Sequence, residues 1–204
     1  MYTPNSYKNE DFKEIKSFIT KNSFGILINQ NNGKLTGTHI PLVLDINKNG
    51  ENILTGHISK VNPQWKNFND DDEVLVIFSG PHSYISSSWY EQENVPTWNY
   101  IAVHIYGSIK IIEGEELLNS LKKLVNKYEK GSENPIRIET MSEKNLKQIN
   151  GIIGFNIKIN DIQATYKLSQ NRKEPDYDTI IHKLENTTSP NSIEIAKQMK
   201  KRRK

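Results

Sequence analysis

The chain has 204 residues, of which 35% are hydrophobic and 25% charged, and its net charge is +3. No window has the ~18 apolar residues of a membrane-spanning helix, and the N-terminus lacks the basic and apolar regions of a secretory signal. Cysteine is absent, which excludes disulfides and thiolate chemistry and fits a cytoplasmic, globular protein.

The first part of the chain predicts one helix followed by strands that short turns connect. Apolar residues recur at helical spacing over 9–21. Asn-Gly pairs at 32–33 and 49–50 mark two turns between strands. The predicted strands are 23–30, 35–45, 52–59 and 73–80. Both alternating sets of side chains in the fourth strand are apolar, which predicts that it is buried on both faces.

An aromatic segment, GPHSYISSSWYEQENVPTWNY at 80–100, follows the fourth strand. It is much longer than an ordinary hairpin loop, and it holds Trp89 and Trp98. A long strand is predicted at 98–112, where aliphatic and aromatic side chains alternate. We therefore expect one face of this strand in the core and the other against a subunit or a ligand.

The remaining sequence predicts an amphipathic helix at 113–131, a capping box at 140–143 and a hairpin of two strands. These strands are expected at 151–159 and 161–170, and two helices at 175–185 and 189–204. Helices are missing between most strands, which argues against a doubly wound parallel sheet. The pattern favours an α+β, mainly β fold: a six-stranded antiparallel, Greek-key-like barrel with peripheral helices.

Two strand ends carry groups that could bind an anion or a polar ring. TGHISK at 55–60 offers an imidazole, a hydroxyl and an ammonium, and KLSQNR at 167–172 offers amides and a guanidinium. The alternatives are a polar strand end and a solvated turn. The histidines have no metal-ligand spacing, and phosphate loops, dinucleotide fingerprints and catalytic triads are absent, so no metal and no catalytic residue are predicted.

Several segments together resemble the PaiB-type FMN-binding transcriptional regulators, over about Met1 to Glu185. The segments are THIPLVLD, TGHISKVNPQW, VIFSGPHSYISSSWY, VPTWNYIAVHIYG, GIIGFNIKI and KLSQNR. The resemblance implies the FMN-binding split β-barrel, a bacterial cytoplasmic homodimer with FMN at the subunit interface, and a negative regulator of sporulation and degradative-enzyme genes.

The resemblance also implies roles for individual residues. His57, Ser59 and Lys60 would hold the FMN phosphate, and Thr38 and His39 would reach the phosphate or the ribityl chain. Residues expected to approach the flavin from the other subunit or the ring edge are Trp98, Asn99, Ser169, Gln170 and Asn171. Relatives that oxidise pyridoxamine phosphate hold phosphate with several arginines, whereas the first arginine here is Arg137, so FMN binding is expected to be weaker.

The aromatic rings are expected to divide by role. Trp89 and Tyr90 would wall the pocket over the flavin, and Arg172 would add a charge. Trp98, Tyr100 and Tyr106 would be covered by the partner subunit or lie beside the flavin. The alternative is local packing within the loop.

The expected organisation is an FMN-binding domain at 1–185 and a basic helix or tail at 186–204. The basic run KQMKKRRK fits either a solvated helix end or, as a second partner, DNA. We expect a regulator without enzymatic activity. The alternative is a small FMN-dependent oxidoreductase of the flavin reductase or pyridoxamine-phosphate oxidase type.

Overall fold

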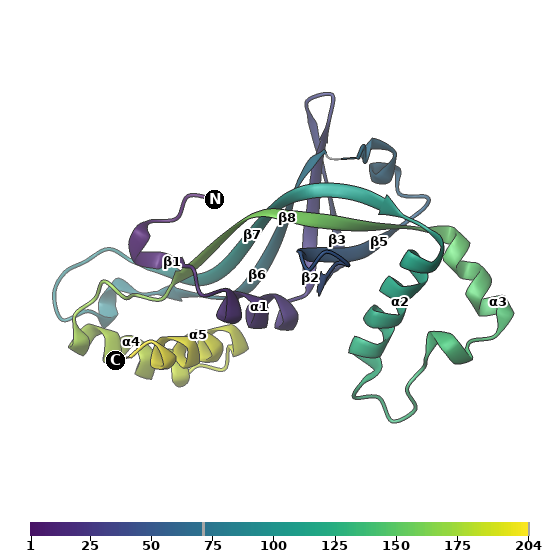
Figure 1. Ribbon diagram of the computed structural model, residues 1–204. Helices are drawn as coiled ribbons and strands as arrows, with labels where there is room; N and C mark the ends of the chain where they lie inside the picture. Colours follow the sequence, from purple (N-terminus) through teal and green to yellow (C-terminus); the bar gives the residue numbers. More distant parts are fainter. Residues whose placement is uncertain (71, 204) are drawn as a thin grey trace. The chain divides into compact units, whose positions relative to one another are not determined.

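The computed structural model describes residues 1–70 and 72–203. In this part of the chain, eight strands form one sheet with the order β3-β2-β6-β7-β8-β5-β4, and β1 pairs with β8 (Figure 1). The strands are β1 (Lys8–Asn9), β2 (Phe24–Asn31), β3 (Lys34–Pro41), β4 (Val43–Ile46), β5 (Asn52–Ser59), β6 (Glu73–Ile85), β7 (Thr97–Ile112) and β8 (Ile152–Lys167).

The helices lie at the periphery of the sheet. The α-helices are α1 (Phe12–Lys21), α2 (Gly114–Glu129), α3 (Glu143–Leu146), α4 (Glu174–Glu185) and α5 (Pro190–Lys201). The short 3₁₀ helices are η1 (Asn5–Tyr7), η2 (Pro63–Asn67), η3 (Ser87–Trp89), η4 (Ile138–Thr140) and η5 (Lys147–Gly151). No helix in the described residues is long and apolar enough to cross a membrane.

The chain divides into two compact units, each made of several segments. The first unit is Met1–Phe18, Ser79–His104 and Gln163–Lys204, and the second is Ile19–Phe78 and Ile105–Ile162. Strands β6, β7 and β8 contribute residues to both units. The predicted domain boundary after residue 185 stays a prediction.

The second unit contains a strongly curved part of the sheet. Strand β3 lies at one end of the strand order and β5 lies next to the other end, yet the two strands contact each other. The pairs β2–β3, β2–β6, β4–β5 and β5–β8 are antiparallel. Fully buried strand residues of this unit include Leu27, Val76, Ile105, Phe155 and Ile157.

The first unit carries the two C-terminal helices. Helices α4 and α5 lie side by side (Figure 1), and their apolar faces are completely buried at Ile180, Leu184, Ile195 and Met199. Pro190 occupies the first turn of α5, as predicted, and the Ser189 hydroxyl caps that helix by accepting from the Ser192 amide.

The predicted mainly antiparallel sheet with peripheral helices is confirmed, but four details differ. The strand predicted at 35–45 is two strands, β3 and β4, which lie at opposite ends of the strand order. The sheet has eight strands in the described residues and not six. The predicted hairpin at 151–170 is a single strand, β8. Strand β6 continues to Ile85, into the segment predicted as a loop, because Ser83 and Ile85 are buried while His82 and Tyr84 alternate outward.

The predicted capping box at 140–143 does not form. Helix α3 begins at Glu143, and its N-cap residue, Ser142, makes no side-chain capping bond. The Thr140 hydroxyl instead donates to the Arg137 carbonyl, 3.2 Å away. Thr140 is the last residue of η4 and lies two residues before the N-cap position of α3, which is too early for its hydroxyl to cap that helix.

Candidate functional site

The GHISK segment ends β5 in a turn whose backbone is firmly held. The Asn62 amide donates to the Ser59 carbonyl at 2.9 Å, and the Lys60 amide donates to the Gly151 carbonyl at 2.8 Å. The Lys60 carbonyl accepts from Trp65 Nε1 at 2.8 Å. The side chains of Ser59 and Lys60 are exposed. A fixed turn therefore presents a hydroxyl and an ammonium to an incoming anion.

His57 lies on the same strand, two residues before Ser59, so both side chains leave β5 on one face. The imidazole is half-buried, and this burial lowers its pKa below the ordinary value. At neutral pH the ring is therefore uncharged and offers one N–H donor. An imidazole N–H, a hydroxyl and an ammonium are groups that can donate hydrogen bonds to phosphate.

Thr38 on β3 is joined to this turn by hydrogen bonds. Asn62 Nδ2 donates to Thr38 Oγ1 at 3.0 Å, and Thr38 Oγ1 donates to Gln64 Oε1. Two of the segments chosen from the sequence, THIP and GHISK, are thus brought together in the second unit. His39 is exposed and stacks on Phe24, with ring centroids 6.1 Å apart, so it points away from Thr38.

Gln64, which was not among the predicted site residues, holds this arrangement in place. Its side chain is buried, and Nε2 donates to the Leu27 carbonyl and to Asn29 Oδ1, both at 3.1 Å. Asn62 caps η2 by accepting from the Gln64 amide at 2.9 Å. The Asn-Pro pair at 62–63 is a helix-start signal that could have marked this residue as ordered.

The predicted flavin contacts in the first unit form a compact internal network. Asn99 and Ser169 are buried and bond to each other, with Nδ2 to Oγ at 2.9 Å and Oγ to Oδ1 at 3.1 Å. Ser169 adopts a left-handed backbone conformation with φ +61°. Gln170 folds back on its own strand and accepts from the Leu168 amide at 2.7 Å. Of the predicted residues in this turn, only Gln170 and Asn171 are exposed.

The aromatic segment lines an open cleft in the first unit. Trp89 and Trp98 line it together with His82 and Tyr84, and the cleft has a volume of about 410 Å³. Trp98 is 52% exposed, and Tyr84 meets it edge to face with centroids 5.9 Å apart. These rings form a surface on which a planar group could stack.

Tyr90, predicted beside Trp89 on the pocket wall, is buried instead. The guanidinium of Arg172 lies 4.4 Å from the centre of its ring, close enough for a cation–π contact. The Tyr90 hydroxyl is buried and has no hydrogen-bond partner among the described residues. The structure thus brings Tyr90 and Arg172 together, while Trp89 lines the cleft.

Comparison with solved structures shows the fold. The FAD- and haem-binding protein of Mycobacterium smegmatis superposes with a TM-score of 0.62 at 12% identity, covering 79% of this chain and 73% of that one. The flavocytochrome Anf3 of Azotobacter vinelandii also gives 0.62 at 16% identity, covering 84% and 75%. The fold is therefore that of the flavin-binding split β-barrel proteins.

Comparison of sequences shows the family. Residues 1–161 match the family model described as "Putative FMN-binding domain". The chain is 46% identical to the "Protease synthase and sporulation protein PAI 2" of Bacillus subtilis over 98% of this chain and 96% of that protein. The chain belongs to this FMN-binding family, in its PaiB-like branch, and this membership supports FMN as its cofactor.

Proposed function

We propose that this chain is a PaiB-like regulator that binds FMN between the subunits of a homodimer and controls sporulation and degradative-enzyme genes. The observation that carries the proposal is the match over nearly the whole chain to a sporulation protein of the same FMN-binding family. The flavin would supply redox chemistry, and the protein would position it.

In this proposal the second unit holds the FMN phosphate. Ser59 and Lys60 extend from a turn with a fixed backbone, and His57 adds a neutral N–H donor on the same face. Thr38 is attached to that turn through Asn62. Trp98 and the exposed amide of Asn171 would come from the other subunit to the ring, whereas the Gln170 amide is already bonded to its own strand.

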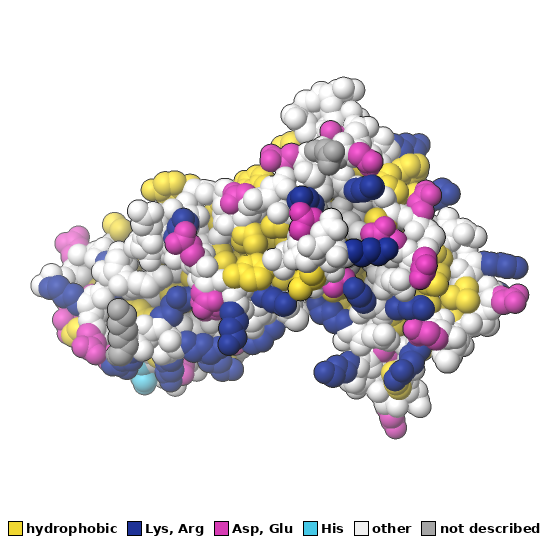
Figure 2. All heavy atoms as spheres, viewed as in Figure 1, with side chains coloured by type: hydrophobic (Ala, Val, Ile, Leu, Met, Phe, Trp, Pro, Cys, Tyr) yellow, Lys and Arg dark blue, Asp and Glu magenta, His cyan; other side chains and the backbone are white. Residues whose placement is uncertain are grey.

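The proposal does not assign DNA binding to the basic tail, because several of its described cations are paired within the chain. Arg202 bonds to Glu14 at 2.9 Å, Arg203 to Asp178 at 2.7 Å, and Lys200 to Glu185 at 2.6 Å. Figure 2 shows basic and acidic side chains intermixed over the C-terminal helices. The regulatory part of the proposal is therefore based on the similarity to the Bacillus subtilis sporulation protein and not on this tail.

FMN titration of the purified protein, followed by absorbance and flavin fluorescence, tests the cofactor site. The double variant with His57→Ala and Lys60→Ala should weaken FMN binding by about tenfold or more, since it removes a charged and a neutral hydrogen bond to phosphate. Lys110→Ala, an exposed lysine on β7, is the matched control. Unchanged affinity in the double variant would refute the phosphate assignment.

Gel shifts test the regulatory role separately. DNA from the promoters of sporulation and protease genes should be retarded at low salt, and retardation should weaken as salt rises. Absence of any shift at low salt would exclude direct DNA binding. Consumption of NAD(P)H upon addition of FMN would favour the oxidoreductase alternative.

A further inference from the structure

A second cleft, of about 510 Å³, lies within the second unit between the β4–β5 hairpin, β8 and α2. None of the residues predicted to hold FMN lines it. Its walls combine charged side chains from α2 and from the hairpin with the apolar side chain of Ile53. The cleft is therefore a separate feature whose chemistry can be considered by itself.

Two polar atoms at the base of this cleft lack partners. Thr55 is only 4% exposed, and its hydroxyl has no hydrogen-bond partner among the described residues. Asn156 lies directly opposite on β8 and lines the same cleft. Its Nδ2 donates to Glu116 Oε1 at 2.7 Å, which leaves the buried Oδ1 without a donor. Unpaired buried polar atoms cost free energy that a ligand can recover.

The charges around these atoms favour a cation. Asp45, Glu115 and Glu116 line the cleft with Lys48 and Lys123. Lys123 is already paired with Asp45. The other charged side chains that line the cleft are the carboxylates of Glu115 and Glu116 and the ammonium of Lys48. Because Glu116 is bonded to Asn156, its negative charge lies next to the unpartnered oxygen. A positively charged hydrogen-bond donor would bond to Asn156 Oδ1 and would also be attracted by the Glu116 carboxylate.

We propose that this cleft binds a small primary amine. Its ammonium group donates hydrogen bonds to Asn156 Oδ1 and Thr55 Oγ1 beside the Glu116 carboxylate, and its carbon chain lies against Ile53. An anion would meet the carboxylates of Glu115 and Glu116, neither of which has an ion-pair partner among the described residues, and an apolar molecule would leave the hydroxyl and the amide oxygen unsatisfied. An ammonium group is the donor that meets all of these conditions.

Two-dimensional amide NMR of the whole chain, titrated with n-butylammonium chloride, tests the proposal. Backbone amides at 45–55, 115–123 and 156 should shift in a saturable way at millimolar concentrations. Tetramethylammonium, a cation without N–H donors, and butan-1-ol, a neutral analogue of the same length, should not produce these saturable shifts. The proposal is wrong if n-butylammonium does not saturate, or if tetramethylammonium gives the same shifts.

Variants locate the contacts. Thr55→Val removes only the hydroxyl and should weaken n-butylammonium binding by about tenfold. Glu116→Gln keeps an acceptor for Asn156 but removes the charge, and should weaken binding as well. Thr140→Val, an exposed threonine outside the cleft, should bind like the unaltered chain. Unchanged affinity in Thr55→Val would overturn the assignment.

The thermal midpoint of the ligand-free Thr55→Val variant gives an independent result. Because the hydroxyl has no partner among the described residues, its removal should leave the midpoint unchanged or raise it. A lowered midpoint would mean that the hydroxyl is already satisfied, and it would count against a ligand role for this residue.

Discussion

Gln64 connects two strands of the second unit through one side-chain amide. Its Nε2 donates to the Leu27 carbonyl and Asn29 Oδ1 and lies 3.2 Å from the Thr36 carbonyl, while Oε1 accepts from Thr38. Gln64→Ala would remove these bonds inside a buried site. We expect it to lower the free energy of unfolding by about 2–3 kcal/mol, measured by urea denaturation.

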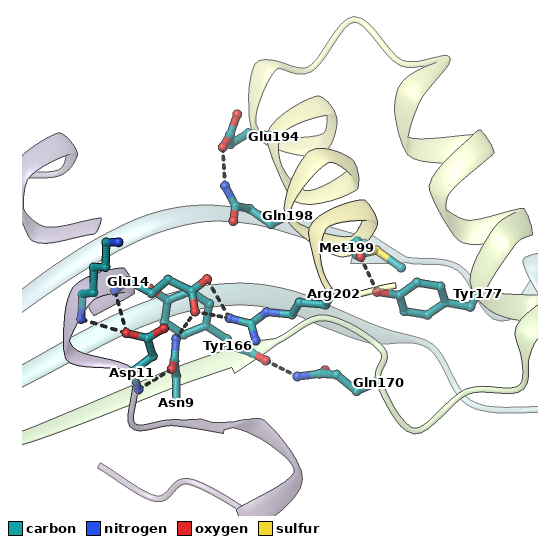
Figure 3. Close-up of polar contacts among 11 residues, drawn as sticks. Asn9, Asp11, Glu14, Tyr166, Gln170, Tyr177, Glu194, Gln198, Met199 and Arg202 are labelled. Carbon is teal, nitrogen blue, oxygen red and sulfur yellow. Dashed lines mark hydrogen bonds and ion pairs between the residues drawn. The ribbon is translucent and has the colours of Figure 1, made fainter. Parts of the chain in front are cut away.

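The matched control for this prediction is Gln198→Ala on α5. Gln198 makes a side-chain bond to Glu194, at 2.7 Å, on a partly exposed helix face (Figure 3). Its loss should cost less than about 0.5 kcal/mol. Equal losses in the two variants would contradict the view that Gln64 anchors the site.

We expect His57 and His104 to make the stability depend on pH. Burial is the main cause that lowers the pKa of both, and the N-terminal ammonium lowers that of His104 further. The unfolded chain takes up protons near the ordinary pKa of about 6.5, whereas the folded chain does so only at lower pH. Their contribution to stability is therefore complete above about pH 6.5 and is lost as the pH falls below it.

Urea denaturation of the FMN-free protein between about pH 7.5 and pH 5.5 measures this dependence. The unfolding free energy should decrease toward the acid end, and the double variant His57→Asn with His104→Asn should show a shallower decrease. An equally steep decrease in the double variant would assign the effect to other groups.

Some features of the site depend on contacts that no local pattern contains. GHISK is visible in the sequence because its donors follow one another at a strand end. The role of Gln64 cannot be read from the sequence, since it depends on a hydrogen bond to the carbonyl of Leu27, 37 residues away. Asn99 and Ser169 are both predicted to approach the flavin, and that role stays a prediction; their mutual bond across 70 residues appears only in the fold.

At the scale of secondary-structure elements, Arg202 fastens the end of α5 to α1. Arg202 Nη2 donates to both carboxylate oxygens of Glu14 at 2.9 Å, and its guanidinium lies 4.7 Å from the ring centre of Tyr166 (Figure 3). Asn9 Nδ2 also donates to Glu14, at 2.7 Å. Glu14→Ala should lower the unfolding free energy by about 1–2 kcal/mol, because both donors lose a partly buried acceptor.

The control for this helix contact is Glu185→Ala. Glu185 pairs with Lys200, whose side chain is 52% exposed, compared with 27% for Arg202. Exposed pairs contribute little, and a carboxylate at the end of α4 opposes the helix dipole. We expect a change of less than about 0.5 kcal/mol. If Glu185→Ala lowered the unfolding free energy more than Glu14→Ala does, the prediction that Glu14 contributes more to stability would be wrong.

The sequence predicted most elements but misjudged where two strands end. Helices α2, α4 and α5 and the long strand β7 follow the periodicity of their side chains. Asn160 and Asp161 favour a turn, yet β8 runs through them because its first half pairs with β5 and its last residues pair with β1. The Gly-Pro pair at 80–81 likewise fails to end β6. Pairing with distant strands outweighed local turn preference at both places.

At the scale of the whole molecule, the proposed interface site makes FMN and self-association mutually dependent. A ligand that binds only the folded state at a hundred times its Kd stabilises it by about 2.7 kcal/mol. For a chain of this size, that should raise Tm by about 5–10 °C. If both subunits contact each flavin, the FMN-induced rise in Tm should grow with protein concentration, and sedimentation should show FMN shifting monomers toward dimers.

The variant with His57→Ala and Lys60→Ala should lose most of the rise in Tm and most of the shift toward dimers. An FMN-induced rise that is independent of protein concentration would place the flavin within one subunit, and absence of any rise would refute FMN binding by the folded chain.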